Sequence, residues 1–226
     1  MNNLFYTESV QESFLKLEDQ EAVHCALVLR KKVGDVIYVI DGKGNRYKCG
    51  IDKLNKREVQ CSILEKEFHP KTEHITIAIA PTKNRDRLEW MIEKLVEIGV
   101  ESIVLMNTTN TERTRTNLDR IHKKMVSAVK QSLRSYVPSL SELSFSDVLK
   151  MNADQKLIAH CYEDQPKRYG HENQDSLSHL ILIGPEGDFT SDEVVLAFEQ
   201  GFKGLDLGDY RLRTETAAIV AVTRFQ

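Results

Sequence analysis

Two stretches near the end of the chain combine glycine-rich or polar turns with charged side chains. Residues 184–187 have the sequence Gly-Pro-Glu-Gly and follow the apolar run 180–183, and residues 212–217 have the sequence Leu-Arg-Thr-Glu-Thr-Ala. Glycines let another group approach the backbone closely, and Glu186 and Arg213 add charges of opposite sign. This combination suits a ligand held mainly by backbone groups beside a charged shell, and it predicts one site built from both stretches.

Both stretches lack the patterns of several common catalytic sites. No Gly-Lys-Ser or Gly-Lys-Thr follows the glycines, and neither GxGxxG nor GxSxG occurs there. No cysteine stands in a nucleophilic context, so the sequence excludes phosphate loops and serine or cysteine nucleophiles. Simpler interpretations stay open: a tight turn at 184–187, a surface ion pair of Arg213 with Glu215, and a helix cap at Thr214 or Thr216.

The composition is that of a globular protein, with 41% hydrophobic and 29% charged residues among 226 and a net charge of −3. No apolar run approaches the ~20 residues of a membrane helix, and the first residues do not resemble a signal peptide. The four cysteines form no CxxC pair and the seven histidines show no ligand spacing. We therefore expect a cytoplasmic protein with neither a metal site nor a membrane segment.

Positive charge is concentrated in one part of the chain. Residues 111–136 carry seven cations against two anions, whereas residues 137–226 carry eight cations against fifteen anions. A locally basic face on an acidic protein suits a polyanionic partner, and the alternative is a solvated helix face. Arg134 could orient a phosphate or a base, or could simply favour a helix C-terminus.

The first seventy residues are predicted to form β structure. Residues 36–40 are an apolar strand, residues 41–45 (Asp-Gly-Lys-Gly-Asn) form a turn, and alternating runs follow at 46–51 and 59–63. Short strands at this spacing predict a small barrel or sandwich. The basic run 30–32 could be an edge strand, which we favour slightly, or could meet phosphates.

From residue 74 on, strands and helices alternate. Strands are predicted at 75–80, 102–106, 156–159 and 180–183. Helices are predicted around 88–96 with a stop at Gly99, from 118 to a stop at Pro138, from the capping-box pair Thr190 and Glu193, and at 214–225. This alternation implies a largely parallel sheet with helices on both faces and a site at its carboxyl edge. With a linker at 68–73, we expect domains at 1–70 and 74–226.

The sequence 182–187, followed by Leu-Gly at 207–208 and by 212–217, resembles the signature of the RsmE family. These are SPOUT-class RNA methyltransferases that modify N3 of a uridine in the 16S RNA of the small ribosomal subunit. Supporting matches cover nearly the whole chain: His24 with 28–30, then 34–35, 41–44, 93–99 and 130–134.

The resemblance implies a PUA-like N-terminal β-barrel that binds RNA and a C-terminal SPOUT α/β domain with a trefoil knot. It also implies S-adenosylmethionine as cofactor, 16S ribosomal RNA as substrate, within the small subunit, and a homodimer. The implied cofactor-binding residues are Ile183, Gly184, Pro185, Gly187, Leu207, Gly208, Leu212, Thr214, Glu215, Thr216 and Ala217.

Such a cofactor supplies the electrophile, so no protein nucleophile is needed. Glu186 is the candidate base, and Arg213 and Arg134 are candidates for stabilising developing charge or positioning RNA. The target base must be unpaired or flipped out, because N3 takes part in Watson–Crick pairing. The candidate RNA-binding residues are Arg30, Lys83, Arg85, Arg113, Arg115, Lys123, Lys124 and Arg134.

The chain departs from the family pattern at two places. Asp188 stands where the family usually has a second glycine, and Asp209 with Tyr210 stand where it usually has proline and arginine. Two alternatives therefore stay open. One is a SPOUT methyltransferase that acts on another RNA, and the other is a non-catalytic RNA-binding protein of the same fold.

Overall fold

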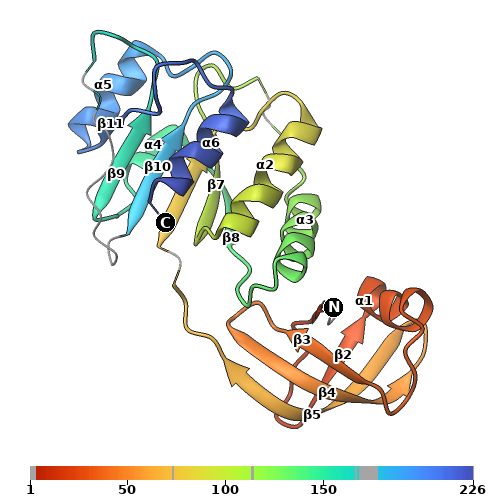
Figure 1. Ribbon diagram of the computed structural model, residues 1–226. Coiled ribbons are helices and arrows are strands. Elements are labelled where there is room, and N and C mark those ends of the chain that lie inside the picture. Colours follow the sequence, from red (N-terminus) through yellow and green to blue (C-terminus); the bar gives the residue numbers. More distant parts are fainter. Residues whose placement is uncertain (1–3, 73, 113–114, 166, 168–177, 226) are drawn as a thin grey trace. The chain divides into compact units, whose positions relative to one another are not determined.

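The chain folds into two units, and the first of them is not contiguous in sequence (Figure 1). A computed structural model describes residues 4–72, 74–112, 115–165, 167 and 178–225. The first unit comprises residues 1–72 and 126–137, and the second comprises 73–125 and 138–226. The expected ranges, 1–70 and 74–226, differ from this division because they place residues 126–137 in the C-terminal part.

The first unit is built on a curled five-stranded sheet with the order β1-β3-β4-β5-β2. Its strands are β1 (Leu4–Tyr6), β2 (Phe14–Glu18), β3 (Val36–Ile40), β4 (Asn45–Leu54) and β5 (Glu58–Phe68). The pair β1 and β3 is parallel and the other pairs are antiparallel. Alternate side chains such as Leu15, Leu17, Cys49, Val59 and Cys61 fill the core, as the period-2 pattern predicts.

Helical structure interrupts this sheet between β2 and β3, where the sequence pattern predicted only β structure. Helix α1 (Asp19–Val23) continues into a π-helical turn, η1 (His24–Val28), and Ala22 and Cys25 are buried in the core. Residues 30–32 follow as a loop in which Arg30 has a φ of 51°. The edge-strand interpretation of 30–32 was therefore wrong.

The turn at 41–45 forms backbone hydrogen bonds with the segment 126–137. The Gly44 N–H donates to the Ser135 carbonyl at 3.0 Å, and the Val137 N–H donates to the Gly42 carbonyl at 3.0 Å. Lys130 forms an ion pair with Glu21 of α1. The glycines at this turn therefore serve a close backbone approach as well as a hairpin.

The second unit contains a six-stranded sheet with the order β11-β9-β10-β6-β7-β8, in which every neighbouring pair is parallel. Its strands are β6 (Ile75–Ile79), β7 (Ser102–Asn107), β8 (Ser139–Ser144), β9 (Gln155–Ala159), β10 (His179–Ile183) and β11 (Lys203–Leu205). The predicted parallel sheet is confirmed, whereas β8 and the short helix α4 (Phe145–Leu149) were not predicted. All five residues of β10 are buried, as expected for a strand covered on both faces.

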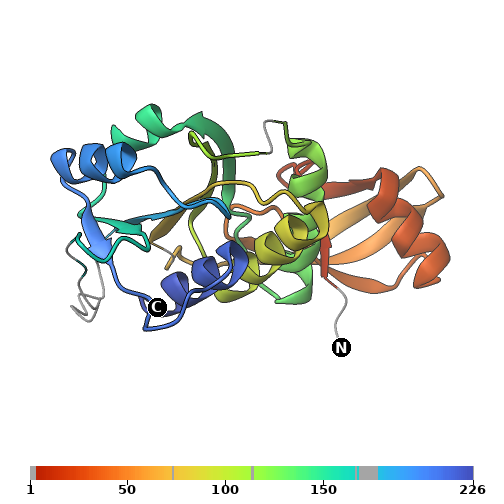
Figure 2. The ribbon, with the colours of Figure 1, turned by 90° about the horizontal axis from the view of Figure 1, so that it is seen from above.

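Helices cover both faces of this sheet (Figure 2). Helices α4 and α5 (Ser191–Glu199) pack on one face, and α2 (Arg85–Ile98) and α6 (Thr214–Thr223) pack on the other. No helix in the described residues is long and apolar enough to cross a membrane.

The structure confirms two predicted helix ends, the stop at Gly99 and the capping box at Thr190, and it contradicts a third. Asn84 caps α2 and Gly99 ends it with a φ of 109°, while Thr190 opens α5 with the predicted capping box. Helix α3 (Leu118–Gln131) is the exception, because it ends well before Pro138. Leu133 takes a left-handed φ of 58° and stays 55% exposed, so the chain leaves the helix to reach the 41–45 turn.

Gly44→Ala is expected to destabilise the protein much more than Gly34→Ala. Both glycines have left-handed φ values, 97° and 91°, which cost an alanine about 1 kcal/mol each. A Cβ at Gly34 meets nothing within 4 Å, whereas one at Gly44 overlaps the Tyr136 ring and lies 2.8 Å from the His69 carbonyl oxygen. The additional loss should be about 2 kcal/mol, measured as the free energy of unfolding in urea. Equal losses in the two variants would contradict this account of the turn.

Candidate functional site

A cavity of about 850 Å³ lies at the carboxyl edge of the parallel sheet in the second unit. Its walls come from the ends of β9, β10 and β11, the loop before α6, the first turn of α6, and Arg87 on α2. Because parallel strands end on the same side of a sheet, these segments converge there although they are far apart in sequence.

The two stretches singled out by the sequence meet in this cavity. The Thr214 hydroxyl donates a hydrogen bond of 3.2 Å to the Gly184 carbonyl, and Thr214 is only 5% exposed. Thr214 is therefore no helix cap: the N-cap of α6 is Arg213, which makes no side-chain capping bond. The hydroxyl instead joins the turn after β10 to the start of α6.

Most residues expected to bind the cofactor lie in the cavity wall. These are Ile183, Gly184, Pro185, Leu207, Gly208, Leu212, Thr214, Glu215 and Ala217. The two others lie elsewhere. Thr216 is exposed on α6, and a Cβ on Gly187 would lie 3.4 Å from Asn110, so this glycine faces the loop after β7.

Gly184 is required by close packing rather than by a special backbone angle. A Cβ there would lie 3.1 Å from the Phe189 ring, and Phe189 is fully buried in the core of this unit. Neither Gly184 nor Gly187 has a positive φ. The residue of this turn with a left-handed backbone is Asp188, with a φ of 63°.

Asp188 thus takes the backbone conformation that a glycine would provide, and aspartate is among the residues that tolerate it. Its carboxylate accepts two hydrogen bonds of 2.8 Å, one from the Cys161 N–H and one from the N–H of the next residue, Phe189. Asn110 Nδ2 donates to the Asp188 carbonyl at 3.0 Å. Asp188, where the chain departs from the family pattern, therefore connects the segments that follow β7, β9 and β10.

The charged candidates have different surroundings. Glu186 and Arg213 are exposed in the cavity wall, and Glu186 Oε1 accepts a hydrogen bond of 3.1 Å from the Lys83 N–H. Glu215 is 8% exposed and its carboxylate lies 3.7 Å from Nε of Arg87. Arg134 belongs to the first unit, where its N–H donates to the Val129 carbonyl.

The candidate RNA-binding cations differ in their ion-pair partners and in their exposure. Arg113 lies outside the described residues. Lys83 pairs with Glu112 at 2.7 Å, and Arg85 and Lys124 each lie 3.7 Å from the carboxylate of Glu89. The remaining ones, Arg30, Arg115 and Lys123, have exposed side chains.

Sequence reasoning did not place the segment 159–161, Arg87 or Asp206 in the wall, whereas Tyr210 and Arg211 lie in the range 207–217 expected to line the cofactor. The signal for 159–161 was present, because the strand before it was predicted and must end at the same edge as its parallel neighbour. Desolvation at the cavity wall raises the pKa of the Cys161 thiol, Asp188 raises it further, and Arg211 opposes both. Among the described residues, no three histidine, cysteine, aspartate or glutamate side chains gather into a metal site.

Two protein-family models match the chain. The model described as an RNA methyltransferase domain matches residues 69–226, and the model described as an RNA methyltransferase PUA domain matches residues 17–64. Their boundary falls near the linker expected from the sequence.

Relatives from several bacteria match nearly the whole chain. It is 30% identical over 231 residues to ribosomal RNA small subunit methyltransferase E of Rickettsia conorii, covering 98% of this chain and 94% of the relative. The crystal structure of a probable rRNA methyltransferase from Porphyromonas gingivalis is 38% identical, with a TM-score of 0.91 over 98% of this chain and 95% of its own. The enzyme of Neisseria gonorrhoeae bound to S-adenosyl methionine is 28% identical, with a TM-score of 0.87 over 99% and 96% of the two chains.

The role of Asp188 predicts an order of stability among its variants. Asp188→Asn should lower the free energy of unfolding least, because asparagine tolerates the left-handed backbone and keeps one hydrogen-bond acceptor. Asp188→Gly relieves the backbone but loses the hydrogen bonds, and Asp188→Ala should cost most, about 2 kcal/mol in total. Urea unfolding of the three variants measures this order. An alanine variant as stable as the glycine variant would contradict the assigned backbone role.

Proposed function

Since the chain belongs to the RNA methyltransferase family that includes the ribosomal RNA small subunit methyltransferases E, we propose that it methylates 16S ribosomal RNA. The methyl donor is S-adenosylmethionine, and the target is N3 of a uridine. The observation that carries this proposal is the cavity in which the Gly-Pro-Glu-Gly turn and the start of α6 are joined by the bond from Thr214 to Gly184.

The wall of the cavity fits S-adenosylmethionine. Its volume of about 850 Å³ lies within the range of small-molecule sites, ~300–1,000 Å³. Much of the wall is turn and loop backbone, which offers N–H and C=O groups to a nucleoside. Six carboxylate residues and four lysine or arginine residues line it, and the excess of negative charge suits a cofactor whose sulfonium is cationic. The solved relative from Neisseria gonorrhoeae holds the same cofactor.

When bound, S-adenosylmethionine supplies an electrophilic methyl group. The residues of this chain must hold the uridine against it and manage one proton, because N3 carries a proton at neutral pH. Backbone groups at 183–185 and 207–208 bind the cofactor, and the loop 205–212 limits access of water. No cysteine or serine nucleophile is needed, and the raised pKa of Cys161 agrees with a thiol that stays protonated.

Glu186 is the proposed acceptor of the N3 proton. Its carboxylate is exposed in the wall, and the bond from the Lys83 N–H to Oε1 fixes one oxygen while Oε2 remains available. Arg213 at the N-terminus of α6 is proposed to stabilise the negative charge that develops on the uracil as the proton leaves. Arg134 of the first unit is proposed to position RNA.

RNA binding is assigned to cations of both units. In the first unit, which matches the PUA model, Arg30 is the candidate. In the second unit the candidates are Lys83, Arg85, Arg113, Arg115, Lys123 and Lys124. The uridine must leave its stack or be unpaired, since its N3 is otherwise engaged with a partner base.

We also propose that the protein is a homodimer that acts on the small ribosomal subunit in the cytoplasm. Helix α6 is apolar on nearly all sides, yet Ile219 and Val220 remain partly exposed, and Trp90 on α2 is 48% exposed. Such uncovered apolar residues favour a protein partner, and a second copy is the simplest one. All four cysteines are free thiols, as is usual for proteins of a reducing compartment.

Sedimentation velocity tests the homodimer. We expect a species of twice 25.9 kDa at micromolar concentration. A single species of 25.9 kDa over that range would contradict the dimer without affecting the proposed reaction.

The alternatives are a methyltransferase of the same class that acts on another RNA, and a non-catalytic RNA-binding protein. Calorimetric titration with S-adenosylmethionine distinguishes an enzyme from a non-catalytic RNA-binding protein, because a protein that does not bind the cofactor releases no heat of binding. Mass-spectrometric mapping of 16S rRNA from a deletion strain, with and without this chain restored, fixes the target. Restored methylation at one uridine supports the proposal, and a methyl group on a different RNA supports the first alternative.

Arg213→Ala is expected to lower kcat by about 10²-fold, because it removes a group that stabilises charge in the transition state. The fold should survive, since Arg213 is exposed and makes no capping bond. Lys203→Ala is the matched control: Lys203 is an exposed cation of the same unit outside the cavity wall, and its loss should leave kcat unchanged. Methyl transfer to unmodified rRNA from tritiated cofactor gives the rates, and full activity of Arg213→Ala would refute its role.

A further inference from the structure

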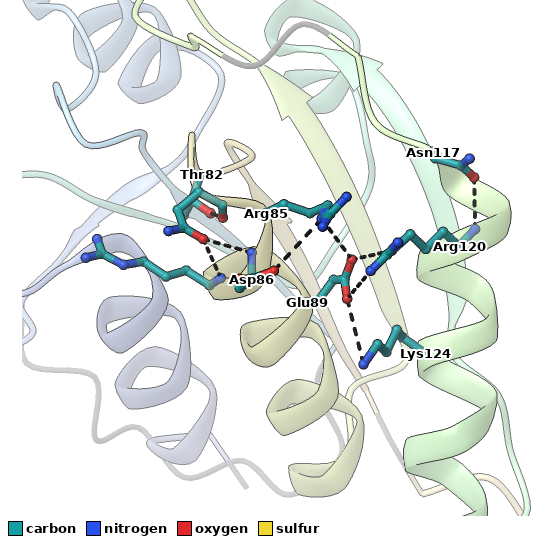
Figure 3. A network of polar contacts seen from close by, with 9 residues as sticks. Thr82, Arg85, Asp86, Glu89, Asn117, Arg120 and Lys124 are labelled. Atoms are coloured by element: carbon teal, nitrogen blue, oxygen red, sulfur yellow. Dashed lines mark hydrogen bonds and ion pairs between the residues drawn. The ribbon is translucent and has the colours of Figure 1, made fainter.

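A buried carboxylate on α2 gathers three cations around itself (Figure 3). Glu89 Oε1 accepts a hydrogen bond of 2.5 Å from Nε of Arg120, and its Oε2 accepts one of 3.2 Å from Nη2 of the same guanidinium. Lys124 Nζ and Arg85 Nε each lie 3.7 Å from an oxygen of Glu89. The Glu89 side chain is only 8% exposed, so all three cations converge on an anion that is shielded from water.

Local structure fixes the positions of these cations. Arg85 and Glu89 are one helical turn apart on α2, and Arg120 and Lys124 are one turn apart on α3, so each pair shares a helix face. The side chain of Asn117 accepts a hydrogen bond of 3.0 Å from the Arg120 N–H at the start of α3. The arrangement therefore needs both helices, and Figure 3 shows the side chains of α2 and α3 pointing toward one another.

Stability alone is a poor explanation for Glu89. Its neighbours Leu88, Met91 and Ile92 are buried and apolar, and apolar residues commonly replace a buried ion pair without loss of stability. The hydrogen bonds from Arg120 hold the pKa of Glu89 below its ordinary value, so the carboxylate is charged near neutral pH. A charged group retained at such a place suggests that it orients its partners.

The three cations keep positive charge available to solvent. Arg85, Arg120 and Lys124 are 58%, 49% and 43% exposed, and one carboxylate cannot neutralise all three. Asp86, 3.9 Å from Nε of Arg85, and Asp119 at the start of α3 reduce this excess, while Lys123 adds to it. Guanidinium and ammonium groups bind phosphate oxygens well, and the substrate proposed above is RNA.

Helix α2 carries both the cluster and one residue of the cavity wall. Arg87, two residues after Arg85 and therefore on a different face of the helix, lines the cavity and lies 3.7 Å from Glu215 there. An RNA strand whose base enters the cavity must place its neighbouring phosphates close to the entrance.

We propose that Glu89 holds Arg85, Arg120 and Lys124 as a binding site for the phosphate groups that flank the target nucleotide. The inference rests on the proposed function, because it takes RNA as the substrate. Glu89 is a positioning residue: it fixes cations that would otherwise lose side-chain freedom when they bind. Arg120 is the central phosphate-binding residue of this site, since its two hydrogen bonds to Glu89 set the plane of its guanidinium.

The test separates orientation from net charge. Glu89→Gln and Glu97→Gln each raise the net charge by one, and Glu97 is a partly exposed carboxylate on the same helix that pairs with Lys94. If the cations acted through net charge alone, both variants would bind RNA equally well or more tightly than the wild type. If Glu89 orients them, Glu89→Gln should bind about tenfold more weakly, while Glu97→Gln should not weaken binding.

Arg120→Lys is the second variant, and it keeps the charge at a half-exposed position. It should also bind severalfold more weakly, because an ammonium lacks the planar fork. The slope of log K against log [KCl] should stay close to that of the wild type, because the variant keeps the positive charge. The probe is 16S rRNA from a strain without this chain, both free and in the small subunit, measured by filter binding.

Two further measurements show whether a loss of RNA binding comes from the phosphate site or from misfolding. Affinity for S-adenosylmethionine should be unchanged in Arg120→Lys, because Arg120 lies outside the cavity wall, and thermal unfolding reports whether each variant is folded. Wild-type affinity of Arg120→Lys for the rRNA would overturn the phosphate site, while wild-type methylation would leave the proposed function intact. A wild-type protein that neither binds nor methylates the rRNA would overturn both.

Discussion

The parallel alignment of β9, β10 and β11 is the constraint on which the site depends. It places three strand ends at one edge, and side chains then fasten the segments that follow: Thr214 bonds to the Gly184 carbonyl, and Asp188 bonds to the Cys161 N–H. Each of these bonds satisfies a backbone group at a turn that no strand partner can reach. The cavity is therefore a consequence of how the sheet ends, and the chemistry of its wall is set by a few side chains in the turns.

Electrostatics divides the second unit into two regions along α2. The cavity wall carries more carboxylates than cations, which suits a positively charged methyl donor, whereas the cluster around Glu89 carries more cations than carboxylates. A protein with a net charge of −3 can thus bind a polyanion, because screening confines each charge to its neighbourhood within about 10 Å.

The first unit shows how a short glycine-containing turn can organise distant sequence. The turn at 41–45 binds residues 135–137 through backbone hydrogen bonds, and Lys130 pairs with Glu21 of α1. Helix α3 consequently begins among residues of the second unit and ends among those of the first.

The sequence by itself determined the parallel sheet, the capping box at Thr190, the stop at Gly99 and the two stretches that meet in the cavity, because periodicity, caps and turns are local. It misplaced residues 19–32 and the end of α3, and it left Asp188 unexplained. Only the tertiary structure decided these, since the π-helical turn fills a core, α3 ends to reach a distant turn, and Asp188 bonds to Cys161 across 27 positions. The cluster around Glu89 was hidden for the same reason: its charges converge only when α2 and α3 pack together.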